Sequence, residues 1–422
     1  MDRGAHHGPG AWPLHRDPPR PGAGRVSRDR LAALERGTGL VFGLDPEVTA
    51  PRAPRGATAR EALESVVLEA LQRPPCLVSF SGGRDSSSVL AVAAHVARRE
   101  GLPLPVPTTL VFPECESAEE SAWQELVVRH LALPEWNRVV LHDEIDLVGP
   151  LARPVLRTLG RTWPFNVYFH VPIFELARGG TVLSGVFGDE TTSAGWAWRH
   201  ENLVAQRLRP GGPRDLARIV LAAAGPRAVR GQVLRRREVR RDEVPTRPPW
   251  LTEYAFDIVQ DARRDQAERE SLSLRRSMTQ TLWRLRSRVL GLETLDRLAA
   301  EYDVTHSAPF ADERFVGALL AERSWRMFET RTAAVRHLVG DLLPEEMCAR
   351  SSKAYFDSAF FHRHARAFAH DWDGTGLDPD YVVAEELRRT WTHDDEPDAR
   401  TFALLQDAWL AADRRSPASD RA

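Results

Sequence analysis

The sequence predicts an α/β protein in which a parallel sheet is flanked by helices and followed by an α-helical C-terminal portion. Between residues 58 and 206, short apolar runs alternate with amphipathic segments of helical length. This alternation is typical of a parallel sheet covered on both faces. Beyond residue 251 the apolar residues recur at helical spacing. Ligands of parallel sheets bind beyond the carboxyl ends of the strands, so we expect the functional residues there.

The elements can be placed in order by their patterns. Apolar runs predict strands at 76–81, 107–112, 138–142 and 181–185. Apolar residues spaced by three and four predict helices at 58–72, 87–100 and 117–133, with a further helix before residue 181. Residues 251–345 are interpreted as amphipathic helices throughout.

Composition shifts divide the chain into five parts. We expect a disordered or loosely packed tail at 1–57, the α/β core at 58–206, an Arg- and Pro-rich linker at 207–250, a helical part at 251–414 and a tail at 415–422. The linker could bind nucleic acid. A solvated linker is favoured instead, because aromatic residues are sparse in it and acidic residues interrupt it.

Bulk composition excludes several classes of protein. The 422 residues carry a formal net charge of -2, which does not favour nucleic acid or an anionic membrane as a partner. Cys76, Cys115 and Cys348 are far apart and form no metal-binding pattern, which indicates a reducing cytoplasm. No signal peptide and no apolar run of about 18 residues is present. We therefore expect a cytoplasmic protein.

The first strand runs into the sequence SGGRDSSS at 81–88, which precedes a helix. Gly82 and Gly83 allow a tight turn that presents backbone N–H groups to an anion, and the helix N-terminus adds positive dipole. Asp85 would repel a phosphate unless a metal lies between them, so it is a candidate Mg²⁺ ligand. A plain Gly-Gly turn with serine caps is the alternative, and the strand–loop–helix context disfavours it.

This loop resembles the SGGxDS loop of the N-type ATP pyrophosphatases, which split ATP to AMP and pyrophosphate. The sequence VLSGVFGDETTSAG at 182–195 resembles the C-terminal synthetase domain of asparagine synthetases, in which a strand ends in Ser-Gly-Glu-Gly-x-Asp-Glu. Ser184, Gly185, Asp189 and Glu190 match that motif. The resemblance implies that Asp189 is a second carboxylate for Mg²⁺.

Two later segments are similar to the same family. DRLAAEYDVTHSAPFAD at 296–312 resembles the family stretch DRxSMAxSxExRxPFLD, and residues 331–356 resemble KxxLR followed by LP and RxxKxxF. The resemblance therefore covers about residues 70–365. The matching positions are Asp296, Arg297, Pro309, Phe310, Asp312, Arg336, Leu343, Pro344, Arg350, Lys353 and Phe356.

The resemblance implies an adenine nucleotide alpha-hydrolase-like fold with ATP and Mg²⁺ as cofactors. Leu110 and Val111, at the end of the second strand, are expected to line the adenine pocket. Asp296, Arg297, Asp312, Arg336, Arg350 and Glu190 are expected supporting residues. The remaining ATP-binding residues are expected to be Phe80, Ser81, Gly82, Gly83, Asp85, Ser86, Ser87, Ser184 and Gly185.

Lys353 is the chain's one lysine, since the other 56 of the 57 basic residues are arginine. It falls at the position where the family keeps a catalytic lysine. A compact, mobile ammonium suits a moving negative charge better than the planar guanidinium of arginine does. The alternative is a chance residue in an arginine-rich chain, but the position favours a catalytic role.

Several positions depart from the family pattern. Val186 replaces a glutamate near the chemistry in asparagine synthetases, and valine cannot transfer a proton. Thr305 and Ser307 replace the Glu and Arg of SxExR, and Thr332 replaces the Lys of KxxLR. The segment before the loop is also too short for the family's glutaminase domain, so we expect no glutamine hydrolysis.

These departures leave several functions open. The resemblance implies an amide ligase that activates a carboxylate as an acyl-adenylate and transfers it to an amine, in peptide or natural-product biosynthesis, as in lasso-peptide cyclases and β-lactam synthetases. The alternatives are an asparagine synthetase using ammonia, free or from a partner glutaminase, and a non-catalytic ATP-binding protein. Transfer RNA thiolation is disfavoured because no cysteine lies in a suitable motif. A separate partner protein could deliver the substrate.

Overall fold

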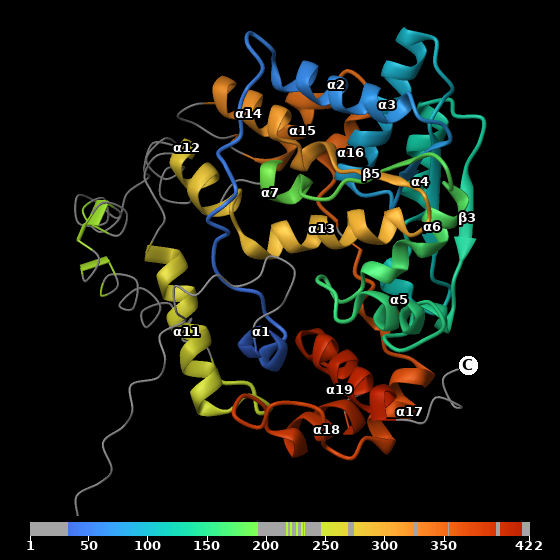
Figure 1. Ribbon diagram of the computed structural model, residues 1–422. Helices are drawn as coiled ribbons and strands as arrows, with labels where there is room; N and C mark the ends of the chain where they lie inside the picture. The colour runs from blue at the N-terminus through green and yellow to red at the C-terminus, as the bar shows by residue number, and fades with distance from the viewer. Residues whose placement is uncertain are drawn as a thin grey trace, which may run out of the picture.

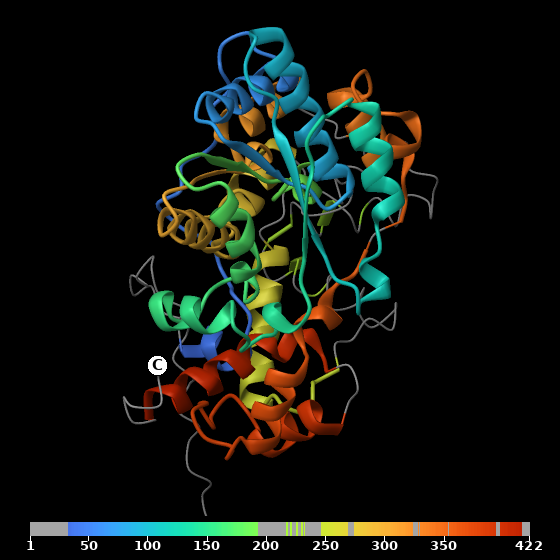
Figure 2. The ribbon, with the colours of Figure 1, turned by 90° about the vertical axis from the view of Figure 1, so that its right-hand side faces the viewer.

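The computed structural model of the protein describes residues 33–192, 246–268, 274–323, 330–352, 354–393 and 397–415, together with residue 328 and isolated positions between 217 and 232. The tail up to residue 32, most of the predicted linker, residues 416–422 and Lys353 lie outside the described residues. Two views of the ribbon show how the described elements are arranged (Figures 1 and 2).

The sheet contains five parallel strands in the order β3-β2-β1-β4-β5. The strands are β1 Cys76–Ser79, β2 Val106–Val111, β3 Asn137–Val140, β4 Thr181–Leu183 and β5 Thr305–Ser307. The four predicted strands are thereby confirmed. The expectation that 251–345 is helical throughout is wrong at β5, which pairs with β4 from Thr181 opposite Thr305 to Leu183 opposite Ser307. Three residues, none of them apolar, carry too little alternation to predict a strand.

The predicted helices are present and others join them. The α-helices of the core are α1 Ala33–Thr38, α2 Ala59–Leu71, α3 Arg84–Glu100, α4 Ser121–His130, α5 Ala152–Leu159, α6 Val171–Leu176 and α7 Gly188–Thr192. Those of the C-terminal portion are α11 Glu253–Glu268, α12 Leu274–Ser277, α13 Arg286–Ala300, α14 Glu313–Glu322, α15 Arg331–Val339, α16 Glu345–Ala349, α17 Arg363–Asp371, α18 Ala384–His393 and α19 Phe402–Arg415. In the described part of the chain, no helix has the length and apolarity needed to cross a membrane.

The two faces of the sheet are covered by different sets of helices. Alternation along the strands directs Val78 and Leu183 to a core that contains α2, α3, α14 and α15. It directs Leu77 and Val182 to a second core that contains α5, α6, α17 and α19. Figure 1 shows the first group of helices at the top and α17, α18 and α19 together at the bottom, with α13 running between them. Figure 2 shows the strands from the side, with helices on both sides of the sheet.

Residues 33–57 pack against the body of the protein, which differs from the loosely packed tail that composition predicts. Glu35 is only 4% exposed, and its carboxylate lies 2.9 Å from Nη2 of Arg286 on α13. Leu44 forms an antiparallel bridge with Leu285. The apolar residues of the segment follow no helical or strand period, and a buried ion pair leaves no periodic signal, so composition alone does not predict this packing.

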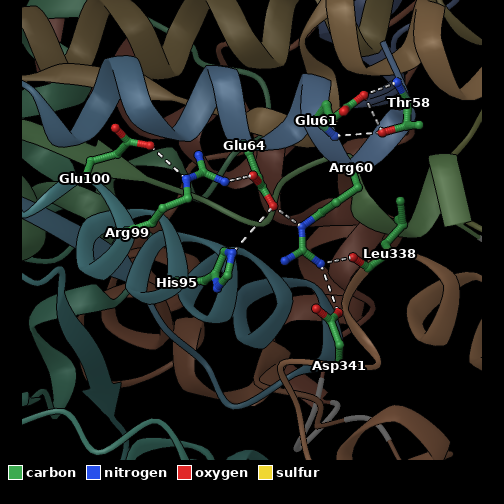
Figure 3. Close-up of polar contacts among 9 residues, drawn as sticks. All are labelled: Thr58, Arg60, Glu61, Glu64, His95, Arg99, Glu100, Leu338 and Asp341. Atoms are coloured by element: carbon green, nitrogen blue, oxygen red, sulfur yellow. Dashed lines mark hydrogen bonds and ion pairs between the residues drawn. The ribbon is translucent and has the colours of Figure 1, made fainter.

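A cluster of charged residues joins the outer ends of α2 and α3 (Figure 3). Glu64 on α2 accepts hydrogen bonds from Arg60, at 2.6 Å, and from Arg99 on α3. Arg60 also contacts Asp341, at 3.2 Å, in the segment after α15. Burial raises the pKa of Glu64, but the hydrogen bonds from the two arginines outweigh burial and lower it overall. The cluster holds α3 in place, and the other end of this helix belongs to the loop SGGRDSSS at 81–88, which we name the phosphate loop.

Candidate functional site

A cavity of about 890 Å³ opens at the carboxyl ends of β1, β2 and β4. Its lining comes from the loop after β1, the end of β2, the segment 184–190 after β4, one face of α13, and residues 350–356. Because β1 has β2 on one side and β4 on the other, the strand order reverses at this point. Open parallel sheets bind ligands at such a position, and the volume suits a small-molecule site.

Most of the residues predicted to bind ATP or metal line this cavity. Among the described residues these are Phe80, Ser81, Gly83, Asp85, Ser86, Leu110, Ser184, Gly185 and Asp189, and the predicted supporting residues Glu190 and Arg350 also line the cavity. Gly82, Ser87 and Val111 do not belong to the lining. Ser87 is fully buried in the core. Alternation along β2 directs Thr108, Leu110 and Phe112 to the cavity, and so directs Val111 away from it. Lys353 lies outside the described residues, while Ser352 and Ala354 line the cavity.

The phosphate loop has the geometry of an anion site. Gly82 has φ +85°, and a Cβ there would lie 2.8 Å from Cγ of Gln124, so glycine is required on both counts. Gly83 is the N-cap of the 17-residue helix α3, and no described side chain caps it. Ser86 Oγ lies 3.1 Å from Ser81 Oγ and 3.2 Å from the Ser81 backbone N. The helix N-terminus is therefore open toward the cavity and favours a negative ligand.

Asp85 and Asp189 approach each other, and the guanidinium of Arg331 binds both. Arg331 Nη2 lies 2.6 Å from Asp85 Oδ2, and Nη1 contacts Asp189 Oδ1. A Cβ at residue 188 would lie 2.4 Å from Asp85 Cγ, so Gly188 permits the approach of the β4–α7 loop. Burial raises the pKa of Asp85, and Arg331 opposes this. Arg331 was not among the predicted site residues. Its position was nevertheless a usable signal, because Arg331 directly precedes Thr332, which replaces the lysine of the family pattern.

Arg350 joins the phosphate loop to the segment that contains Lys353. Its guanidinium donates to the Gly82 carbonyl at 2.7 Å, to Glu120 at 2.5 Å and to Ser352 Oγ at 3.0 Å. It also lies over the Trp123 ring, 4.9 Å from the centroid. The residue is only 4% exposed, so this predicted supporting residue is a buried structural link beside the cavity.

A second part of the lining is largely apolar, and we name it the apolar chamber. It comprises the lining residues between 163 and 173 and between 285 and 295, namely Trp163, Pro164, Phe169, His170, Ile173, Leu285, Ser287, Arg288, Gly291, Leu292 and Leu295. Phe356 borders it, with ring centroids 6.1 Å from both Phe112 and Phe169. Sequence patterns predict neither that Phe112 lines the cavity nor that the chamber exists, because the chamber residues come from distant segments.

Arg288 is the one cation among the described residues of the apolar chamber. Its guanidinium lies over the Trp283 ring at 4.0 Å and its Nε donates to the Trp283 carbonyl at 2.7 Å. Burial lowers the pKa of Arg288 to about 10, which still leaves the group charged at neutral pH. A charged group in apolar surroundings can bind an anionic ligand strongly, because few water molecules compete.

A chain of hydrogen bonds leads from the cavity to the surface through His306. Ser184 Oγ lies 2.9 Å from His306 Nε2, and His306 Nδ1 lies 2.9 Å from Asp296 Oδ1. Ser184 lines the cavity, whereas His306 and Asp296 are not part of the described lining. The predicted supporting residue Asp296 is thus connected to the cavity only through His306. His306 was not among the predicted site residues, although it lies between Thr305 and Ser307, which both depart from the family pattern.

The remaining predicted supporting residues lie outside the described lining of the large cavity. Asp312 caps α14, accepting a hydrogen bond from the Arg314 backbone N at 2.8 Å. Arg336 forms an ion pair with Glu345 on the surface. Arg297 borders a separate, smaller cavity. The structure therefore gives a local structural explanation for Asp312 and Arg336.

A five-stranded parallel sheet with an open helix N-terminus after its central strand defines an α/β nucleotide-binding protein of the adenine nucleotide alpha-hydrolase type. The family described as asparagine synthase matches residues 58–411, and the chain belongs to this family. The matched range is the synthetase domain, and membership supports an ATP-dependent amide ligase. A search of curated proteins found no significant match.

Proposed function

We propose that the protein activates the carboxylate of a bulky, apolar acid as an acyl-adenylate, converting ATP to AMP and pyrophosphate, and transfers the acyl group to an amine. The observation that carries the proposal is a single cavity in which the phosphate loop lies beside the apolar chamber. An ATP-dependent ligase must hold the phosphates of ATP and a carboxylate next to each other, and positioning of this kind supplies much of the rate.

The phosphate end would bind the nucleotide. Backbone N–H groups at the N-terminus of α3, with the Ser81 and Ser86 hydroxyls, would hold the phosphates that leave as pyrophosphate. Leu110 and Phe112, at the end of β2, would contact the adenine, since both side chains face the cavity. Stabilisation of developing negative charge by fixed dipoles is a large term in such reactions.

The residues present fit Mg²⁺. Asp85 Oδ1 is buried and has no hydrogen-bond partner among the described residues, and unpaired carboxylate oxygens of this kind are preferred Mg²⁺ ligands. Asp85 and Asp189 would hold the ion, and Arg331 would then be released from the pair. When bound, Mg²⁺ neutralises phosphate charge. Lys353 would follow the charge that moves from the α-phosphate to the acyl carbon, a contribution of about 3–4 kcal/mol.

The apolar chamber favours an acid other than aspartate. Its described lining contains Arg288 but no carboxylate, so the ammonium group of aspartate would be buried there without a counter-ion. Burying an unpaired charge is strongly unfavourable. Val186, which replaces the family glutamate, is 37% exposed and adds apolar surface to the cavity. An acid with an aromatic or aliphatic body, such as a hydrophobic peptide, would match this surface.

The test is exchange of [³²P]pyrophosphate into ATP with Mg²⁺ and one acid at a time. The panel comprises aspartate, N-acetylphenylalanine, indole-3-acetate and a benzyloxycarbonyl-capped hydrophobic dipeptide, with Asp85→Asn as the inactive control. We expect apolar acids to support exchange at least about tenfold faster than aspartate, a difference of about 1.4 kcal/mol. Preference for aspartate would instead identify an asparagine synthetase that uses ammonia. Tight ATP binding without exchange for any acid would identify a non-catalytic ATP-binding protein.

A further inference from the structure

Amide formation from an acyl-adenylate releases a proton. The amine R′NH₂ attacks R–CO–AMP, the new C–N bond forms, the C–O bond to AMP breaks, and one N–H proton must leave: R–CO–AMP + R′NH₂ gives R–CO–NHR′ + AMP + H⁺. A group with an accessible lone pair speeds this step by accepting the proton. Val186 and Thr305 stand at two positions where the family pattern has glutamate, and neither side chain can act as a base.

The Ser184–His306–Asp296 chain has the hydrogen-bond polarity that a proton acceptor needs. The Asp296 side chain is 61% exposed and so carries a negative charge, which requires His306 Nδ1 to donate to it. In a neutral imidazole, Nε2 is then the acceptor, and Ser184 Oγ donates its proton to Nε2. The oxygen lone pairs of Ser184 are left to accept a proton from a group in the cavity.

We propose that Ser184, His306 and Asp296 form a relay that removes the proton from the attacking amine. The amine proton passes to Ser184 Oγ as the hydroxyl proton passes to His306 Nε2. His306 becomes an imidazolium paired with Asp296. After the amide has formed, the Nε2 proton returns to Ser184 Oγ as Ser184 gives a proton to the released AMP or to water in the cavity, which restores the starting tautomer. The inference rests on the proposed function. Ser184 touches the substrate, whereas His306 and Asp296 act through it as positioning residues.

The surroundings of His306 support the relay. Its side chain is 1% exposed, so water cannot substitute for the Ser184 contact. His170 also lines the cavity, and its pKa is lowered to about 3 by burial first and by His306 second, so it stays neutral beside the imidazolium. Asp85 and Asp189 bind Arg331, and Glu120 binds Arg350. Three of the four carboxylates in the described lining are therefore engaged elsewhere, and Glu190 is the fourth.

The test separates adenylation from acyl transfer. With ATP, Mg²⁺ and the acid of the panel that exchanges fastest, pyrophosphate exchange reports adenylation, in which no amine proton is lost. Transfer is then measured to hydroxylamine, which is unprotonated at neutral pH and gives up its proton readily, and to methylamine, which needs a base. His306→Asn should retain exchange and hydroxamate formation within about twofold. Its kcat for the methylamide should fall by about 10²–10⁴-fold with unchanged KM for methylamine.

Two further variants complete the experiment. Asp296→Asn should lower methylamide formation at least tenfold, because His306 then loses its fixed tautomer. His370→Asn is the matched control, since His370 forms an exposed pair with Asp371, 3.0 Å away and outside the lining of the cavity, and all rates should be unchanged.

Wild-type methylamide formation in His306→Asn overturns the relay, as does equal loss of exchange and transfer. An acyl ester on Ser184 overturns it in favour of a nucleophilic serine. Absence of exchange with every acid defeats the proposed function itself.

Discussion

The two ends of the cavity are built in different ways. The phosphate end consists of backbone N–H groups, glycines that permit close approach and charged side chains with defined partners, among them Asp85, Arg331 and Arg350. The apolar chamber consists of side chains from distant helices whose common property is apolar surface. Directional hydrogen bonds and ion pairs therefore determine what binds at the phosphate end, whereas size and apolar surface determine what binds in the apolar chamber. Changes at the first should therefore abolish function, whereas changes at the second should alter which acid is used.

The largest expected effect is at Arg350. Arg350→Met should lower the free energy of unfolding by about 3–5 kcal/mol, because Glu120 and the Gly82 carbonyl would lose a buried partner. Urea denaturation measures this, with Arg363→Met as the control, because the Arg363 side chain is 72% exposed although it pairs with Asp143. A loss below about 1 kcal/mol would show that the phosphate end does not depend on this contact.

Lys353→Arg should lower the rate of AMP formation about 10²–10³-fold while ATP still binds, because a planar guanidinium cannot follow a compact moving charge. AMP release and isothermal titration with ATP provide the two measurements. Full activity in this variant would show that Lys353 has no catalytic role. Weaker ATP binding with an unchanged rate of AMP formation would show that Lys353 binds the nucleotide.

Arg331→Gln should tighten binding of Mn²⁺, used as a paramagnetic substitute for Mg²⁺, at least about tenfold in the absence of nucleotide. The guanidinium that neutralises Asp85 and Asp189 is then gone, and two ion pairs of about 1 kcal/mol each no longer oppose the metal. Electron paramagnetic resonance of free Mn²⁺ measures the binding, with Arg331→Lys as the charge-preserving control. Equal affinities in the variant and the wild type would contradict competition between arginine and metal.

Gly291→Leu tests the apolar chamber. A Cβ at this position would have one described neighbour within 4 Å, Pro164 Cδ at 3.7 Å, so α13 has room for a side chain to start here, and Gly291 lines the chamber that a leucine would enter. We expect exchange with the bulkiest acid to fall about tenfold relative to the smallest one, with ATP affinity unchanged. Gly291→Ala is the matched smaller substitution. An equal fall for all acids would place the acyl group elsewhere.

The smallest effect is expected at Arg336, which the family pattern marks but the structure places on the surface. Its ion pair with Glu345 is exposed on both sides, so Arg336→Ala should change stability by less than about 1 kcal/mol and leave exchange unchanged. A more than tenfold decrease in the rate of pyrophosphate exchange would show that Arg336 contributes to the functional site.

The sequence predicts the phosphate end far better than the apolar chamber. The SGGRDSSS loop and the Asp189 motif are local patterns with a direct physical meaning, and they come together at the cavity as expected. Arg331 and His306 were missed because each acts one position away from a family residue. The short strand β5 carries no periodicity, yet it places His306 beside Ser184. Alternation along β2 separates Leu110, which lines the cavity, from Val111, which does not.

Arg350 joins the phosphate loop to the segment that borders the apolar chamber, and under the proposed function this contact would couple the binding of ATP to the binding of the acid. One buried guanidinium binds both the phosphate loop and Ser352, and Phe356 further along the same segment borders the apolar chamber. If a bound nucleotide orders the phosphate loop, Arg350 also orders the segment that borders the apolar chamber. The acid then binds to a wall that is already ordered, so its binding has a smaller entropic cost. Reciprocity then requires that the acid raise the affinity for ATP by the same factor. A double titration of the two ligands would reveal this cooperativity without any turnover.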